Sequence, residues 1–128
     1  MGEFFAILLI AALCFLFAAQ MFYWFCVHRL VEFEYTNYYE FWLEDGKPIG
    51  GFGTVGKSRE SSFWAGSWAR EACIGKWLTE TPDWIERDLR ALDRLNKLRR
   101  AHKVMWFSVY VIGAVFFVTL FFRYEDWI

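Results

Sequence analysis

The chain has 128 residues, a formal net charge of −1 and an aromatic content of 23%. Its three cysteines, Cys14, Cys26 and Cys73, show no paired spacing, which excludes a disulfide framework and predicts small buried thiols. The nearly balanced charge gives no indication of a nucleic-acid partner, and we expect none.

Two long stretches, Phe4 to Val27 and Val104 to Phe122, contain no Asp, Glu, Lys, Arg or His. At about 1.5 Å per residue, a helix of either length crosses the roughly 30 Å hydrocarbon core of a bilayer. The first stretch lacks the basic start and the short apolar core of a signal peptide, so we interpret it as an uncleaved anchor. We therefore predict an all-α membrane protein with two transmembrane helices. Its parts are residues 1–27, the first helix with a short outer N-terminus; residues 28–103, a partly helical, Trp-rich loop; residues 104–122, the second helix; and residues 123–128, an outer tail.

The basic residues predict the orientation. All 14 Lys and Arg residues except Arg123 lie in the loop, so the positive-inside rule predicts a cytoplasmic loop and outer termini. The expected location is a bacterial inner membrane or, alternatively, a mitochondrial inner membrane with the loop in the matrix. The basic residues nearest the spans are Arg29, Arg94, Lys97, Arg99, Arg100 and Lys103. They set topology, and they are also candidates for contacts with anionic headgroups, which contribute on the order of 1 kcal/mol each.

Aromatic and small residues mark further candidate contacts. Expected interface anchors at the span ends are Trp24, Trp106, Tyr124 and Trp127. The loop holds five more tryptophans (Trp42, Trp64, Trp68, Trp77 and Trp84), which predicts that it lies against the membrane surface or a partner. Within the spans, Gln20 and Gly113 are the positions at which a partner helix is expected to make contact.

The loop carries signals for three helices. Asn37 with Glu40 resembles a capping box that opens a short helix over residues 38–44, which Gly46 ends. Residues 46–58 are rich in glycine and predict an irregular segment, and Ser61 or Ser62 is expected to cap a helix to about Leu78.

The third loop helix is the best defined by sequence. Thr81 is a suitable N-cap and Pro82 suits the first helical position. Acid-before-base pairs at i, i+4 follow, as does an apolar stripe at helical spacing. The pairs are Asp83–Arg87, Glu86–Arg90 and Asp93–Lys97, and the stripe is Ile85, Leu89, Leu92, Leu95 and Leu98. We predict one amphipathic helix from Pro82 that is continuous with the second span.

Two motifs indicate chemistry but lack its context. Residues Gly51 to Ser58 match the phosphate-binding pattern GxxxxGK[ST], yet no buried strand precedes them and no metal-binding Asp follows an apolar run. We therefore expect no nucleotide. His28 and His102 flank the loop face of the spans and could ligate haem or a metal, but interfacial histidines are commonplace. With no catalytic constellation present, we predict no enzyme and no cofactor.

The layout resembles the universal stress protein B family of small bacterial inner-membrane proteins. The corresponding parts are Asp45-Gly46, Gly50-Gly51-Phe52, residues 64–70 and residues 85–100. Residues 44–48 and 81–84 also look like segments of uncharacterised two-span bacterial proteins. The resemblance implies a similar architecture and a stress-linked role, and it carries no catalytic residue over.

These features lead to three expectations of function. The first is a non-enzymatic accessory or assembly subunit docked on a larger membrane complex, with lipids and other membrane subunits as partners. The second is a stand-alone stress-related protein acting at the lipid surface. The third is a bis-His haem or metal protein.

Overall fold

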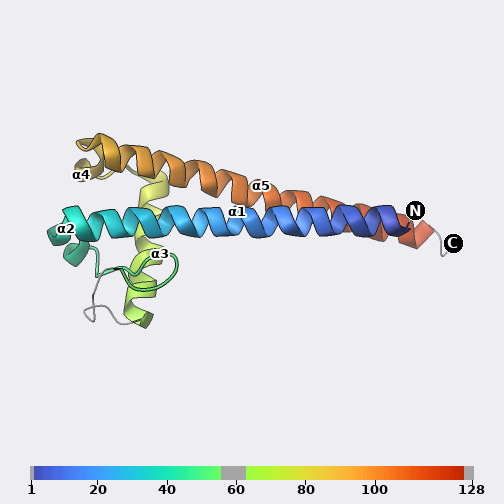
Figure 1. Ribbon diagram of the computed structural model, residues 1–128, viewed down its shortest axis with the longest axis horizontal. Helices are drawn as coiled ribbons and strands as arrows, with labels where there is room; N and C mark the ends of the chain where they lie inside the picture. The colour runs from blue at the N-terminus through green and yellow to red at the C-terminus, as the bar shows by residue number, and fades with distance from the viewer. Residues whose placement is uncertain (1, 56–62, 126–128) are drawn as a thin grey trace. The chain divides into compact units, whose positions relative to one another are not determined.

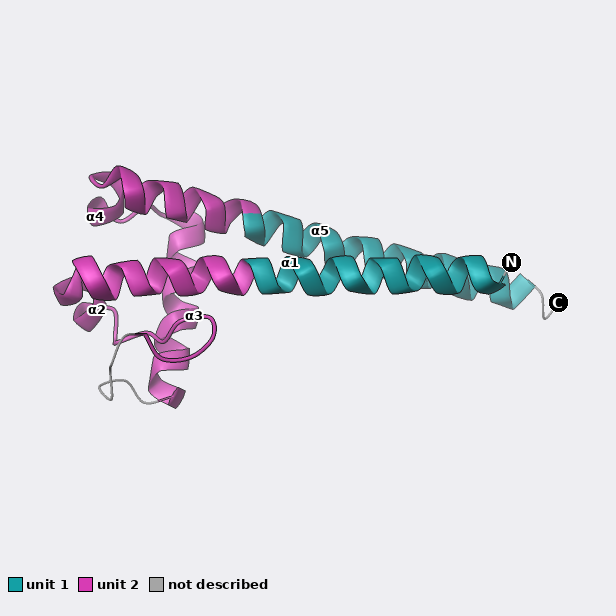
Figure 2. Ribbon diagram, viewed as in Figure 1, with its two compact units in different colours: residues 1–22, 101–128 teal, residues 23–100 magenta. Residues whose placement is uncertain are grey.

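The computed structural model describes residues 2–55 and 63–125, which form five helices and no β-strand. The helices are α1 (Gly2–Asn37), α2 (Tyr39–Glu44), α3 (Phe63–Thr79), α4 (Asp83–Glu86) and α5 (Leu89–Glu125) (Figure 1). They form two compact units: unit 1 comprises residues 1–22 and 101–128, and unit 2 comprises residues 23–100 (Figure 2).

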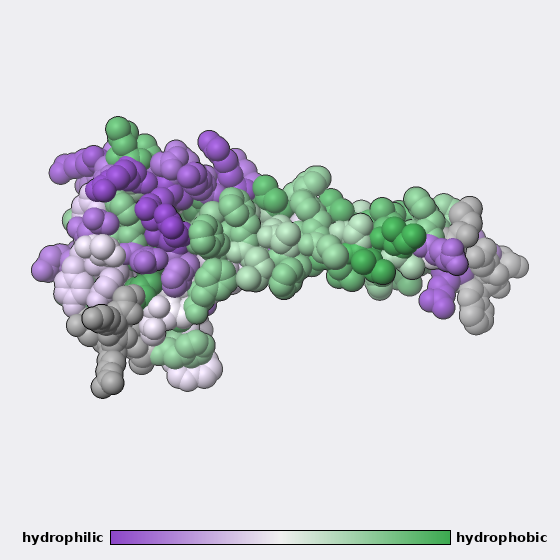
Figure 3. All heavy atoms as spheres, viewed as in Figure 1, coloured by the Kyte–Doolittle hydropathy of each residue, from purple (hydrophilic) through white to green (hydrophobic). Residues whose placement is uncertain are grey.

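Unit 1 is an antiparallel pair made by the first part of α1 and the last part of α5. Phe5 lies 5.5 Å from Phe122 and Phe15 lies 6.4 Å from Phe107, measured between ring centroids. The small residues Ala12, Ala19 and Ser108 are buried, while most large apolar side chains point outward. By length and composition, both α1 and α5 could cross a membrane, as the sequence predicts. Figure 3 shows hydrophobic residues along this unit and mainly hydrophilic ones over unit 2.

Unit 2 is a helical bundle with its own core. The largest fully buried side chains include Leu30 and Val31 on α1, Trp42 on α2, Trp77 on α3, and Leu95 and Leu98 on α5. Burying an apolar side chain of this size contributes roughly 1.5–3 kcal/mol relative to leaving it in water. Trp42 keeps its polar atom satisfied, because its Nε1 donates to the Pro48 carbonyl at 3.0 Å.

The predicted capping box is wrong. Asn37 ends α1 instead of starting α2, and its side-chain nitrogen donates to the Phe33 carbonyl at 3.2 Å. The short helix begins at Tyr39, its N-cap is Tyr38, and no side chain caps it. The predicted end is confirmed: α2 stops at Glu44, and Gly46 adopts a φ of +88°, a conformation that glycine reaches without steric cost.

The single helix predicted from Pro82 is also interrupted. α4 ends at Glu86 and α5 begins at Leu89, with Arg87 and Asp88 between them. The Oδ1 atom of Asp88 accepts a hydrogen bond from the Arg90 backbone N–H at 3.0 Å, so Asp88 caps α5. From that cap onward α5 is one continuous helix, so the predicted continuity with the second span is confirmed.

The interruption changes the register of the side chains. Leu89, predicted on the apolar stripe, is 81% exposed, whereas Ile85, Leu95 and Leu98 are buried. Asp93 and Lys97 form the predicted pair at 3.1 Å, but among the described residues Arg90 lies 3.6 Å from Asp88 and forms no ion pair with Glu86.

Thr81 is not the predicted N-cap, since Pro82 occupies that position and no side chain caps α4. The Thr81 hydroxyl instead accepts a hydrogen bond from Arg99 at 3.1 Å. The expected cap at Ser61 or Ser62 lies outside the described residues.

Candidate membrane-interface site

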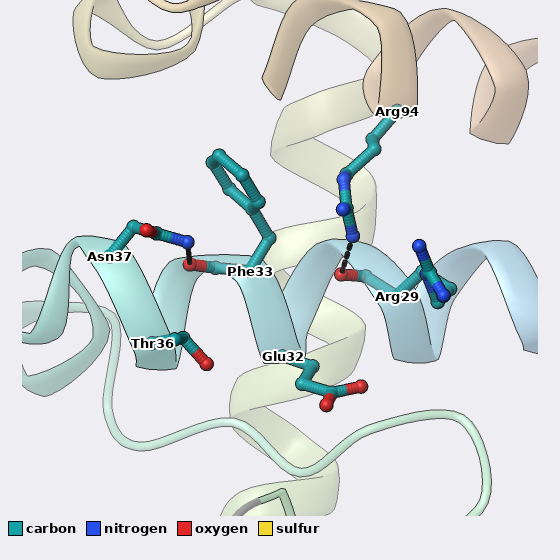
Figure 4. Close-up of a pocket in the computed structure, with 6 residues that line it drawn as sticks. All are labelled: Arg29, Glu32, Phe33, Thr36, Asn37 and Arg94. Carbon is teal, nitrogen blue, oxygen red and sulfur yellow. Dashed lines mark hydrogen bonds between the residues drawn. The ribbon is translucent and has the colours of Figure 1, made fainter. Parts of the chain in front are cut away.

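An arginine pair lines a pocket in unit 2. The arginine pocket has a volume of about 220 Å³ and is lined by Arg29, Glu32, Phe33, Thr36, Asn37 and Arg94. Five of these residues come from the last turns of α1, and Arg94 reaches them from α5 (Figure 4). The Nη1 atom of Arg94 donates to the Arg29 carbonyl at 3.3 Å, which fixes the long side chain against α1.

Aromatic contacts hold the guanidinium groups in place. The Arg94 guanidinium lies 4.7 Å from the centroid of the Phe33 ring, and that of Arg90 lies 5.4 Å from the same ring. Arg29 lies 5.8 Å from the Phe25 centroid. Such cation–π contacts contribute about 0.5–1 kcal/mol at exposed sites, enough to restrict the orientation of a mobile side chain.

The pocket carries uncompensated positive charge. Among the described residues, neither Arg29 nor Arg94 has a carboxylate within ion-pair distance. Burial lowers the pKa of Arg94, and the charge of Arg29 lowers it further, while Glu32 raises it. Two guanidinium groups and one carboxylate therefore share the pocket, for a formal charge near +1.

The glycine-rich segment packs on α1. A Cβ atom at Gly50 would overlap the His28 ring, and one at Gly51 would overlap the Trp24 carbonyl oxygen. Nδ1 of His28 accepts a hydrogen bond from the Phe52 backbone N–H at 3.4 Å. The packing of this segment against α1 is therefore a sufficient reason for glycine at the two positions. The remaining letters of the GxxxxGK[ST] match, Gly56 to Ser58, lie outside the described residues.

Helix α3 lies across α1 (Figure 1), and its Arg70 contacts Trp24 of α1. The Arg70 guanidinium lies 4.8 Å from the Trp24 ring centroid, and its Nη1 donates to the Gly50 carbonyl at 3.1 Å. Three large side chains near the start of α3 remain uncovered: Phe63, Trp64 and Trp68 are 63%, 75% and 76% exposed. We call these three residues the α3 aromatic end.

The tryptophan-rich loop largely covers its own rings. Trp42, Trp77 and Trp84 are buried within unit 2. Trp84 stacks 6.2 Å from Phe41 and lies 4.8 Å from Tyr38. Among the loop tryptophans, only Trp64 and Trp68 are exposed. That the loop lies against a membrane surface or a partner stays a prediction, and it depends on these two rings.

A buried carboxyl group is the feature that sequence reasoning missed. Glu34 is fully buried, and neither of its oxygens has a hydrogen-bond partner among the described residues. Burial raises the pKa of Glu34 to about 10, with a further contribution from the neighbouring Asp45, while the charge of Lys76 lowers it. Burial also raises the pKa of the nearby Cys73 thiol. The signal was present in the sequence, because Glu34 follows the buried Val27, Leu30 and Val31 at helical spacing.

The other predicted basic residues divide into structural and exposed ones. Arg99 donates to the Trp77 carbonyl at 3.0 Å and to the Glu80 carbonyl at 3.2 Å. It therefore provides hydrogen-bond donors for backbone carbonyls at the C-terminal end of α3. These contacts give Arg99 a structural role, and its headgroup contact stays a prediction. Lys97 pairs with Asp93, and Arg100 and Lys103 are exposed.

The predicted anchors and histidines occupy separate environments. Trp106 is 47% exposed and its Nε1 donates to Nε2 of His102 at 3.0 Å. His28 lies 3.8 Å from Glu32 and accepts from Phe52. Within residues 2–55 and 63–125, no group of three His, Cys, Asp or Glu side chains could hold a metal ion.

The remaining predicted positions lie in unit 1 or outside the description. Tyr124 is exposed and Gln20 is partly exposed. A Cβ atom at Gly113 would meet none of the described residues within 4 Å. Trp127 lies outside the described residues. Cys26 and Cys73 are buried, but Cys14 points outward from α1, so the expectation of buried thiols is wrong there.

The fold and the pocket define an all-helical protein with two helices long and apolar enough to cross a membrane and an arginine pocket in the connecting unit. No family model, curated protein or solved structure matches the chain. The resemblance to the universal stress protein B family therefore stays a prediction.

Proposed function

We propose that this chain is a non-enzymatic two-span membrane protein whose unit 2 binds the cytoplasmic membrane surface through the α3 aromatic end. The observation that carries the proposal is the exposure of Phe63, Trp64 and Trp68 on a helix fixed beside Trp24. Trp24 follows most of the first apolar stretch and is expected at the bilayer interface, the depth that tryptophan prefers.

The position of α3 supports a lipid partner. Arg70 ties the middle of α3 to Trp24 and Gly50, so the aromatic end lies on a helix held near the expected interface. Rings at that depth bury their apolar faces among acyl chains and keep the indole N–H groups near water. Interfacial binding scales with the apolar area that is buried, and three large aromatic residues supply such an area.

The proposal is tested with purified protein in vesicles. Fluorescence is compared between the wild type and a W64F/W68F variant, and the difference isolates the emission of Trp64 and Trp68. We expect this emission to be quenched by lipids brominated near the headgroup end of the acyl chains and to be protected from acrylamide in the water. W106F serves as the control, because Trp106 lies at the end of the second predicted span.

Two outcomes would contradict a lipid partner. Quenching by acrylamide alone would place the rings in water. Resistance to both quenchers would mean that protein covers the rings, either a second copy of the chain or another subunit.

A second candidate function, an accessory or assembly subunit of a larger membrane complex, is favoured by Gly113. Glycine in a helix interior is less favourable than alanine by about 1 kcal/mol in water, yet no packing among the described residues requires glycine at this position. Small residues let a partner helix approach closely within a membrane. Native gel migration after gentle solubilisation, followed by mass spectrometry of co-migrating chains, tests this candidate. Recovery in a fixed ratio with a large complex would support it, and migration as a monomer or small homo-oligomer would contradict it.

A further inference from the structure

We propose that the arginine pocket between α1 and α5 is a binding site for a phosphate group, held by Arg29 and Arg94. This inference deepens the proposed membrane-surface function and rests on it for one of two sources of that group. The phosphate belongs either to a lipid headgroup or to a free phosphate ion. Both present negatively charged phosphate oxygens to the two arginines.

The geometry supports an anion with several oxygens. Arg29 and Arg94 come from positions 65 residues apart and meet at one pocket of about 220 Å³. Arg94 uses one nitrogen, Nη1, in its hydrogen bond to the Arg29 carbonyl, and a guanidinium group has five N–H donors in a planar fork. That fork matches the spacing of phosphate oxygens. Thr36 also lines the pocket, and Figure 4 shows Arg94 reaching from α5 toward the lining residues of α1.

The electrostatics favour an anion over the alternatives. Two cations placed side by side repel each other, and Arg94 is also partly removed from water. The only carboxylate in the lining, Glu32, is half exposed and also lies near His28. A bound phosphate would relieve the repulsion through charge-assisted hydrogen bonds, which are about twice as strong as neutral ones.

The pocket is distinct from the general basic surface. Arg99 is committed to the end of α3 and Lys97 to Asp93, so neither is available as a further ligand. Arg29 follows the first apolar stretch by two residues, which is the position at which headgroup phosphates are expected. A net charge near +1 fits the single charge of a phosphodiester, such as phosphatidylglycerol, and we expect that lipid to bind more tightly than phosphatidylcholine.

The test is native mass spectrometry of the full-length protein in mild detergent. The protein is titrated with phosphatidylglycerol or with phosphatidylcholine of the same acyl chains, and bound lipids are counted. The pocket variant is R29Q/R94Q. The matched control is R100Q/K103Q, which removes the same charge from exposed positions outside the pocket. We expect R29Q/R94Q to weaken phosphatidylglycerol binding about tenfold or more, and R100Q/K103Q to weaken it clearly less, because exposed basic residues attract the headgroup without enclosing its phosphate.

A third variant checks the sign of the electrostatic argument. Glu32→Gln raises the formal charge of the pocket, so it should tighten phosphatidylglycerol binding while the fold is retained. Circular dichroism of each variant establishes that the helices remain. Equal binding by R29Q/R94Q and the wild type would overturn the proposal, as would equal losses in R29Q/R94Q and R100Q/K103Q.

Competition with millimolar inorganic phosphate identifies the source. If phosphate displaces the lipid, the pocket binds free phosphate as well as the headgroup. If it does not, the pocket binds the phosphate of the headgroup only. The quenching of Trp64 and Trp68 by brominated lipid is measured on the same pocket variant. If R29Q/R94Q loses phosphatidylglycerol binding while the quenching of Trp64 and Trp68 is unchanged, the pocket and the α3 aromatic end bind lipid separately. Failure of one proposal can therefore be told from failure of the other.

Discussion

The hydroxyl of Tyr38 donates a 2.7 Å hydrogen bond to Oδ2 of Asp88, across 50 residues of sequence. Asp88 uses its other oxygen to cap α5 through the Arg90 backbone N–H. One carboxylate therefore joins the residue between α1 and α2 to the start of α5. This hydrogen bond lowers the pKa of Asp88, and it is also the largest cause that raises the pKa of Tyr38.

We expect Tyr38→Phe to lower the thermal stability of unit 2 at neutral pH, because the Asp88 carboxylate loses a donor. The pKa of Asp88 is depressed in the folded state, so this stabilisation is present above its ordinary pKa of 3.8 and is lost as the pH falls through the lowered value. The difference between the variant and the wild type should therefore vanish in acid. Melting followed by circular dichroism in detergent measures it. Tyr35→Phe is the control, and an equal loss in that variant would contradict the role of the Tyr38 hydroxyl.

Glu34 predicts an unusual dependence of stability on pH. Its pKa rises from 4.5 to about 10 on folding, so the folded state binds one more proton than the unfolded state between these values. The stability of the wild type should therefore fall as the pH rises through this window, by up to about 1.4 kcal/mol per pH unit. Glu34→Gln keeps the shape without the charge, and it should be more stable than the wild type at pH 8 and similar below pH 4.5.

Chemical denaturation at several pH values checks this prediction. Glu32→Gln provides the matched control, since Glu32 lies two residues away with a half-exposed side chain. A wild type and a Glu34→Gln variant with parallel stability profiles between pH 5 and 9 would show that Glu34 is not held neutral in the fold.

Arg99 should be needed for stability rather than for lipid contact. Its guanidinium reaches two carbonyls and the Thr81 hydroxyl, a set that a lysine ammonium cannot match in geometry. We expect Arg99→Lys to cost about 1.5–3 kcal/mol of unfolding free energy, the range for hydrogen bonds to charged groups. Arg100→Lys, at an exposed position, should change stability by less than about 0.5 kcal/mol. Comparable losses in both variants would contradict this assignment.

Two glycines should respond oppositely to alanine. A Cβ atom at Gly51 would overlap the Trp24 carbonyl oxygen, so Gly51→Ala should force the segment off α1 and cost roughly 1–3 kcal/mol. Gly75 lies inside α3, and no residue that the structure describes comes within 4 Å of an added Cβ atom, so Gly75→Ala should stabilise by about 0.8–1 kcal/mol. The melting temperatures of the wild type and the two variants, measured in one detergent, test both expectations. Stabilisation by both would mean that the segment does not pack on Trp24.

Local sequence alone determined most of the helices. The apolar stretches predicted the two long helices, and the absence of glycine and proline after Val27 allowed α1 to continue to Asn37. Gly46 marked the end of α2 correctly. These features depend on hydropathy, on side-chain spacing and on the conformational preferences of glycine, all of which act between residues close in the chain.

The tertiary structure decided the helix starts and the site. Asn37 and Thr81 were reasonable caps by residue type, but alternatives for a cap differ by only about 1 kcal/mol, and contacts with Phe33 and Arg99 outweigh that difference. The meeting of Arg94 with Arg29 and the bond from Tyr38 to Asp88 also join segments distant in sequence. Such pairings depend on how the helices pack against one another, which the spacing of residues along a single helix does not encode.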